Sequence, residues 1–314
     1  MIHSRAFYAM GAHMLAAIDT PGTEIPAILD EAPAWFEEWE AALSRFRPES
    51  ELSRLNRQTG SFVRVSDTLW AVYRAAVEAE KRSQGLVTPT VYASMEKIGY
   101  THSLTGQQPP FFTPIPDPEA SWIPAPIPSL AAITADPQSQ ALRIPSHARL
   151  DFGGIAKGWA AHQALERLQA FGPALVDAGG DLAVGKPPLK SGAWPVGIED
   201  AFQPGHIREN LQLAGCGVAT SGRDYRRWQQ GDVWRHHLID PRTGLPADTD
   251  ILTATVIAPT AMEAEMAAKT VLILGSQAGL SWLEGQPGYA GLLLLENGGT
   301  LESQRFEMYR WGGE

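Results

Sequence analysis

The residues best suited to chemistry lie in a glycine-rich stretch, residues 150–162, which reads LDFGGIAKGWAAH. Asp151 comes just before Gly153 and Gly154, and Lys157 follows where an apolar, helix-like run begins. Glycines let the backbone approach a ligand closely, and the free N–H groups of a helix start suit phosphate. The pattern predicts either a phosphate-binding loop or an ordinary turn before a helix, and alone it favours the turn.

A second pair of glycines, Gly179-Gly180, follows a short apolar strand predicted at 174–176. Paired glycines after a strand either allow close approach to a ligand or form a tight turn. Further along, His236 and His237 are adjacent, so on a strand they point to opposite faces and do not ligate one metal together. A histidine titrates near neutral pH and can act as a general base, but a histidine held by hydrogen bonds within the fold fits the sequence equally.

Glu265 and Lys269 lie four residues apart in a predicted helix over 261–274. This spacing places both side chains on one helix face, one turn apart. They form either part of a ligand site or an exposed ion pair worth about 0.2–0.5 kcal/mol.

Several separate segments, residues 150–162, 176–185, 219–225 and 236–246, resemble in order and spacing the ApbE family, the FAD:protein FMN transferases. The resemblance extends from about Met10 to Gly275. It implies one ApbE-like domain over residues 1–314, with two subdomains that form an FAD cleft. The mixture of hairpins and helices independently predicts an α+β fold with mixed or antiparallel sheets and packed helices, because no βαβ unit repeats. The glycine pairs also lack the GxGxxG spacing of a dinucleotide fold.

The resemblance also implies roles for single residues. The residues expected to bind FAD are Met10, Phe46, Asp151, Lys157, Gly179, Gly180, Ile239 and Lys269. His237 is the expected catalytic base, and the Gly154 carbonyl and Glu265 flank the expected Mg²⁺ site. Relatives have a threonine ligand where this chain has Lys269, and an ammonium group cannot ligate a metal. We therefore expect Mg²⁺ to bind poorly or not at all, with the charge of Lys269 in its place.

The expected activity is transfer of FMN from FAD to a serine or threonine hydroxyl of a flavin-accepting protein, with release of AMP. Two alternatives stay open because the metal site is altered. One is an FAD-binding module with weak or no catalysis, and the other is an FAD pyrophosphatase that produces FMN and AMP.

Composition limits the other classes of function. The 314 residues include 44% hydrophobic and 19% charged residues, typical of a globular protein with a sizeable core. The net charge of −10 argues against a nucleic-acid partner. A single cysteine, Cys216, excludes an internal disulfide. Neither a signal peptide nor a membrane span is predicted. We expect a cytoplasmic protein, or an exported one whose leader has been removed.

The periodicity predicts the elements that position these residues. Helices are expected over 28–46 and 65–83, the second with Val77 in its apolar stripe, and after Gly158 with Phe171 in the stripe. Strands are expected over 7–18, 194–200 with 211–219 as its neighbour, and 252–258, and a hairpin over 130–144. Residues 103–128 are a proline-rich insertion, since 109–128 hold eight of the 24 prolines.

Overall fold

The structure is a computed structural model, and it describes residues 1–103, 124–230 and 232–312. Contacts divide the chain into two compact units, each described by itself. Unit 1 comprises residues 1–36, 157–224 and 249–314, and unit 2 comprises residues 37–156 and 225–248. The predicted proline-rich insertion, residues 103–128, falls largely outside the described residues.

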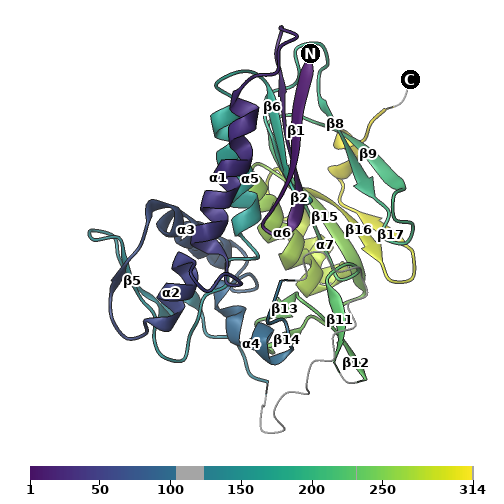
Figure 1. Cartoon of the computed structure of the whole chain (residues 1–314). Coiled ribbons are helices and arrows are strands. Elements are labelled where there is room, and N and C mark those ends of the chain that lie inside the picture. The colour runs from purple at the N-terminus through teal and green to yellow at the C-terminus, as the bar shows by residue number, and fades with distance from the viewer. Residues whose placement is uncertain (104–123, 231, 313–314) are drawn as a thin grey trace. The chain divides into compact units, whose positions relative to one another are not determined.

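Unit 1 is built on an antiparallel sheet of eight strands in the order β1-β2-β6-β7-β10-β15-β16-β17 (Figure 1). The strands are β1 (Ile2–Ala9), β2 (Ala12–Asp19), β6 (Ala174–Ala178), β7 (Asp181–Val184), β10 (Cys216–Gly222), β15 (Ile251–Ala258), β16 (Ala290–Leu295) and β17 (Thr300–Glu302). Every neighbouring pair is antiparallel, which confirms the predicted fold class.

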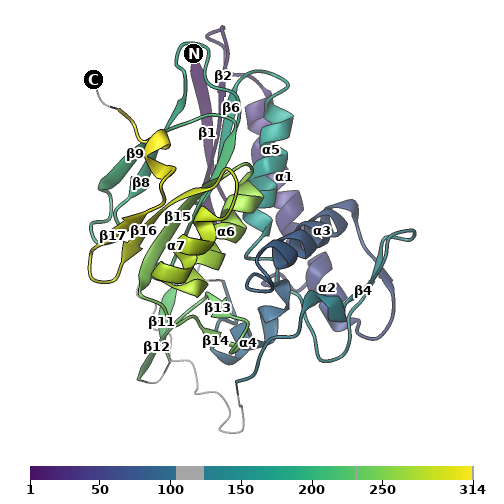
Figure 2. The ribbon, with the colours of Figure 1, turned by 180° about the vertical axis from the view of Figure 1, so that it is seen from behind.

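Helices cover one face of this sheet. Helix α6 (Ala261–Leu274) packs on β10 and β15, and α7 (Ser276–Glu284) packs on β16, as Figure 2 shows from behind. The Thr260 hydroxyl accepts the amide of Glu263 and caps the start of α6. Gly217 of β10 allows this packing, because an added Cβ would lie 2.2 Å from the backbone of Ala261. Since successive strand residues face opposite sides, Val218 faces the other layer.

That other layer is a hairpin of β8 (Trp194–Glu199) and β9 (Ile207–Leu213), with the short helix η3 (Phe306–Tyr309). Trp194, Leu211 and Phe306 pack there against Leu182 and Val218 of the sheet. The charged residue Asp181 precedes Leu182 on β7. By alternation its side chain therefore lies on the face that α6 covers.

The first two boundaries between the units fall within α1 (Ile28–Leu43) and at the start of α5 (Ala156–Leu168), and the other two fall after residues 224 and 248. The described residues of unit 2 contain three further α-helices, two short 3₁₀ helices, a small sheet and two hairpins. They are α2 (Glu51–Arg57), α3 (Asp67–Arg82), η1 (Pro89–Val91), α4 (Tyr92–Lys97), η2 (Leu130–Ala132), β3 (Val63–Arg64), β4 (Thr134–Asp136), β5 (Ala141–Arg143), β11 (Arg227–Gln230), β12 (Val233–His236), β13 (Ile239–Asp240) and β14 (Leu245–Pro246).

The predicted helices over 28–46, 65–83 and 261–274 correspond to α1, α3 and α6, and the hairpin over 130–144 is confirmed as β4–β5. Other expectations were wrong. The single strand over 7–18 is a hairpin, because the chain turns at Met10 and Gly11 with positive φ. Val77 and Phe171 are exposed rather than packed.

The neighbour predicted for the strand over 194–200 was also wrong in part. Residues 211–219 are divided between β9, which pairs with β8, and β10, which joins the large sheet. Helix α2 was not predicted. Within the described ranges, no helix is long and apolar enough to cross a membrane.

Candidate functional site

Four charged side chains of unit 1 form a group that we call the charge cluster: Lys157, Asp181, Glu265 and Lys269. Lys157 is the second residue of α5, and its ammonium group donates to the Asp181 carboxylate. On α6, the Lys269 ammonium lies 3.0 Å from Oε1 of Glu265. With all four groups ionised the cluster is neutral. The predicted i,i+4 ion pair is thus confirmed.

The Glu265–Lys269 pair is largely buried. The Glu265 side chain is 0% exposed and that of Lys269 is 14% exposed. The second oxygen of Glu265, Oε2, accepts the amide of Gly158 at 2.9 Å. That amide is one of the free N–H groups in the first turn of α5, so Glu265 caps the start of another helix. Of the two alternatives, the exposed ion pair is therefore excluded.

Gly158 is required where α5 meets α6. An added Cβ would lie 2.8 Å from Oε2 of Glu265 and 2.9 Å from the carbonyl oxygen of Ala261. The glycine thus brings the start of α5 close enough for its amide to reach a buried carboxylate.

Burial and the neighbouring charges shift the pKa values of both carboxyl groups. Burial, together with the charge of Glu265, raises the pKa of Asp181 to about 6, although Lys157 and Lys269 oppose this shift. Burial also opposes ionisation of Glu265. There the charges of Lys269 and Lys157 and the amide of Gly158 outweigh burial, and the pKa of Glu265 is lowered. Glu265 is the more firmly ionised of the two.

The Gly179-Gly180 turn sets the position of Asp181. Both glycines have positive φ, +69° and +91°, and a Cβ at Gly179 would lie 2.4 Å from the Cβ of Ala12. The Asp177 carboxylate accepts the amide of Gly180 and closes the turn. Asp181 follows as the first residue of β7, directly beside Lys157.

Asp151 lies in unit 2, where Arg45 binds it. Nε of Arg45 lies 2.7 Å from Oδ2 of Asp151, and the two side chains are 4% and 7% exposed. The other oxygen of Asp151 accepts the amide of Gly153 at 2.7 Å. Asp151 therefore fixes the loop that contains Gly154, a half-buried residue two positions before α5.

Arg45 also connects Asp151 to a group of aromatic rings that we call the aromatic cluster: Phe46, Tyr100 and Trp228. The guanidinium lies 4.1 Å from the centre of the Phe46 ring and 4.7 Å from that of Tyr100. Tyr100 stacks on Trp228 with ring centres 5.3 Å apart, and Phe46 meets Tyr100 edge-on at 5.4 Å. Ile239, the first residue of β13, packs in the same cluster. Three predicted residues of unit 2 are thus brought together.

His237 follows the last residue of β12 and is half-buried. Its Nδ1 lies 3.4 Å from the carbonyl oxygen of Arg226, and in the tautomer with the proton on Nδ1 that proton is donated there and Nε2 carries the lone pair. His236 is buried, with Nε2 3.1 Å from the carbonyl oxygen of Ala247. Met10 lies in unit 1, at the β1–β2 turn, with φ of +48°.

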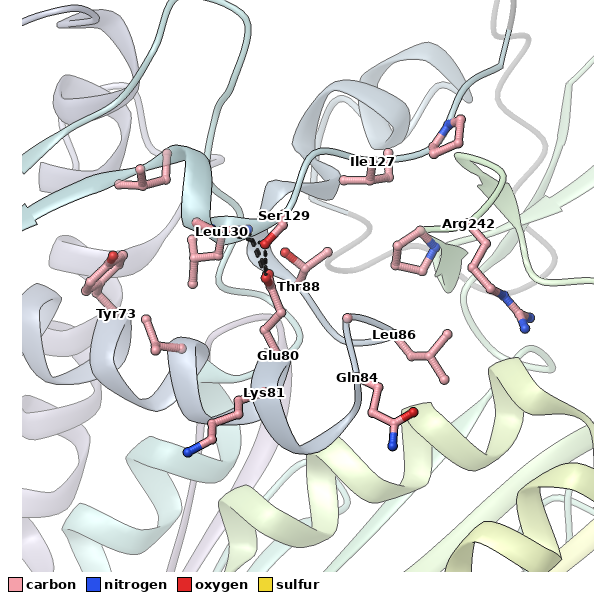
Figure 3. Close-up of a pocket in the computed structure, with 16 residues that line it drawn as sticks. Tyr73, Glu80, Lys81, Gln84, Leu86, Thr88, Ile127, Ser129, Leu130 and Arg242 are labelled. Atoms are coloured by element: carbon pink, nitrogen blue, oxygen red, sulfur yellow. Dashed lines mark hydrogen bonds between the residues drawn. The ribbon is translucent and has the colours of Figure 1, made fainter.

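A pocket of about 710 Å³ lies within unit 2, at the end of α3 and beside residues 126–133. Figure 3 shows Glu80 pointing toward Ser129 and Leu130, whose hydroxyl and amide it accepts, with Lys81 and Arg242 on opposite sides of the residues drawn. None of the predicted site residues lines this pocket. Its charged groups do not converge, so we assign it no chemistry.

Sequence reasoning gave no role to Arg45, Tyr100, Trp228 or Asp181. Only their places in the sequence could have pointed to two of them, because Arg45 precedes Phe46 and Asp181 directly follows Gly179-Gly180. The partners of Arg45 and Asp181 are 106 and 24 residues away, at Asp151 and Lys157.

An antiparallel sheet covered by helices defines an α+β protein, and its unit 1 holds two half-buried ammonium groups, each paired with a carboxylate. The chain belongs to the ApbE family, whose family model matches residues 10–293. This confirms the resemblance seen in the sequence.

Curated relatives agree with this assignment, and solved structures share the fold. The chain is 29% identical over 297 residues to the FAD:protein FMN transferase of Treponema pallidum, covering 87% of this chain and 78% of that protein. It is 25% identical over 265 residues to the Haemophilus influenzae FAD:protein FMN transferase, covering 81% and 75%. The crystal structure of the ApbE protein from Thermotoga maritima superimposes with a TM-score of 0.85 at 21% identity, covering 99% and 100%. The flavin transferase ApbE from Vibrio cholerae superimposes with a TM-score of 0.76 at 22% identity, covering 98% and 99%.

Proposed function

We propose that the chain transfers FMN from FAD to a serine or threonine hydroxyl of an acceptor protein. The hydroxyl oxygen attacks the phosphorus on the FMN side of the pyrophosphate. A new O–P bond forms as the bridging P–O bond to AMP breaks, the hydroxyl proton passes to a base, and AMP leaves. Membership of the ApbE family and the activity of the curated relatives support this proposal.

The observation that carries the proposal on this chain is the pair of partly exposed ammonium groups in the charge cluster, Lys157 at the start of α5 and Lys269 on α6. Phosphoryl transfer needs the charge on the pyrophosphate to be neutralised and the leaving group stabilised. Lys157 and Lys269 are 15% and 14% exposed, so both are held at the edge of the buried cluster, where an anion can approach them. Gly180 leaves open space beside the backbone next to Asp181, which allows a phosphate to approach closely.

The residues present do not fit Mg²⁺. The two oxygens of Glu265 already bind the Lys269 ammonium at 3.0 Å and the Gly158 amide at 2.9 Å. A divalent ion placed against Glu265 would also lie beside the ammonium group, and like charges repel strongly in a partly buried site. In the part of the chain that is described, no group of three or more His, Cys, Asp or Glu side chains could hold a metal ion. We therefore assign the charge neutralisation to the lysines.

In unit 2, we assign Phe46, Ile239 and Asp151 to the flavin end of FAD and His237 to the base. Aromatic rings such as Phe46 offer an apolar surface for a flavin ring. A histidine whose Nδ1 proton is directed to a carbonyl oxygen can accept a proton at Nε2. Met10, Gly179 and Gly180 of unit 1 complete the set of residues assigned to FAD.

The experiment that tests the proposal follows the products of FAD. The purified protein is incubated with FAD and a soluble extract of the organism that encodes it, and AMP, free FMN and protein-bound flavin are quantified. The proposal predicts AMP and protein-bound flavin in equal amounts. AMP matched by free FMN would instead establish a pyrophosphatase, and FAD binding without AMP would establish a binding module.

A further inference from the structure

The contact between Lys157 and Asp181 joins a partly exposed cation to a buried anion. The Asp181 side chain is 2% exposed, whereas that of Lys157 is 15% exposed. The ammonium group therefore lies nearer to solvent than the carboxylate behind it. An incoming anion can reach Lys157 but cannot take the place of Asp181.

Separating this pair is costly. Removing the partner of a buried charge leaves it unpaired in a medium where water cannot compensate. Asp181 is on the sheet face covered by α6, at the first residue of β7, and its backbone is fixed by pairing with Ala219 of β10. Lys157 is fixed at its Cα by the first turn of α5. Asp181 therefore holds the ammonium group in place and cancels much of its charge.

Each element around the pair contributes a charged group. On α6 these are Glu265 and Lys269, which form their own pair, and on β6 it is Asp177, whose carboxylate accepts the amide of Gly180. No further cation of the described residues forms an ion pair with Asp181. Lys157 is thus the cation in direct contact with Asp181, and the one through which Asp181 acts most directly on a ligand.

We propose that Asp181 is a positioning residue that holds the Lys157 ammonium group and limits how strongly it binds the pyrophosphate of FAD. This inference rests on the proposed function, and it adds a residue to which no role in the reaction has been assigned. A bound pyrophosphate shares the ammonium group with Asp181. The site therefore binds the pyrophosphate less tightly than it would if Lys157 were unpaired. This weaker binding favours release of the phosphate-bearing products.

The variant Asp181→Asn tests this inference, because asparagine keeps the shape and removes the charge. Dissociation constants are measured by calorimetry for FAD and for riboflavin, which lacks the pyrophosphate. We expect FAD to bind about tenfold more tightly to Asp181→Asn, because the pyrophosphate then no longer shares the Lys157 ammonium group with a carboxylate. Riboflavin affinity should not change. A role in folding alone would alter both ligands alike or neither.

Two further arms complete the design. In a Lys157→Met background, Asp181→Asn should leave the FAD affinity unchanged, because Asp181 acts through Lys157. Asp250→Asn is the matched control. It removes another carboxylate of unit 1, one that accepts the amide of Ser276 at the start of α7, and it should not tighten FAD binding. Asp181→Ser serves as the second variant if the asparagine protein does not fold.

The possible results separate the inference from the proposed function. If the unaltered protein binds FAD but Asp181→Asn binds it equally or more weakly, the inference is wrong and the proposed function stands. If the unaltered protein does not bind FAD, both fail. An equal gain in the Lys157→Met background would also overturn the inference.

Discussion

The substitution Lys269→Met should lower the free energy of unfolding far more than an ordinary surface substitution does. The substitution keeps the length of the side chain but leaves Glu265, which is 0% exposed, without its ammonium partner. Removing one partner of a buried pair costs about 3–5 kcal/mol of the free energy of unfolding. We expect about 3 kcal/mol, the lower end of that range, because the Gly158 amide still binds the carboxylate.

Urea denaturation measures this loss directly. With a slope of about 1–3 kcal/mol per molar urea, the midpoint should fall by roughly 1–3 M. The chain offers a matched control in Arg82→Met, since Glu78 and Arg82 are also spaced i,i+4 on a helix but are 54% and 44% exposed. That pair should contribute no more than about 0.5 kcal/mol.

A second variant tests the cause of the loss. The double variant Glu265→Gln/Lys269→Met carries no unpaired charge at these positions, so it should recover most of the stability that Lys269→Met loses. If Lys269→Met and Arg82→Met shift the midpoint equally, the pair is not buried in solution and the reasoning about the metal site fails with it.

Three further outcomes are expected. His237→Ala should slow AMP release from FAD by about 10²–10⁴-fold, the usual contribution of a general base, with FAD affinity nearly unchanged; unchanged turnover in a stopped assay would remove its role. Gly158→Ala should lower the melting temperature, because the added Cβ would lie 2.8 Å from Oε2 of Glu265, and a melting temperature equal to that of the parent would contradict the close packing. Hydrogen bonds from Ser276 lower the pKa of Asp250 below 3.8, so its stabilisation is present above about pH 4 and is lost as pH falls through the lowered pKa. Thermal melts of Asp250→Asn beside the parent protein should therefore differ at pH 7 and converge in acid, and a difference that persists at pH 2 would refute this.

Elements with strong local signals could be predicted from the sequence. The helix expected over 65–83 is α3, because the Ser66 hydroxyl caps its start and Gln84 and Gly85, just beyond its end, turn the chain with positive φ. The β1–β2 turn was missed because Met10-Gly11 lacks the Asn-Gly or Asp-Gly signal of a tight hairpin and lies within one alternating run.

The candidate site was predictable only in part. The i,i+4 spacing of Glu265 and Lys269 follows from helix geometry, but the burial of Glu265 depends on Gly158 bringing α5 close to it. Likewise, Arg45 and Asp151 are far apart in sequence, and only the folded unit 2 joins them. Pairings of this kind carry no local signal, so the aromatic and charge clusters could be recognised only from the structure.

The central claim is that lysines, rather than Mg²⁺, neutralise the pyrophosphate during FMN transfer. The most direct measurement is the rate at which protein-bound flavin and AMP appear from FAD, with EDTA and with increasing Mg²⁺, for the unaltered protein and for Lys269→Thr. The account predicts transfer that EDTA does not slow in the unaltered protein, and a dependence on Mg²⁺ in Lys269→Thr. Transfer by the unaltered protein that stops with EDTA and returns with Mg²⁺ would contradict it.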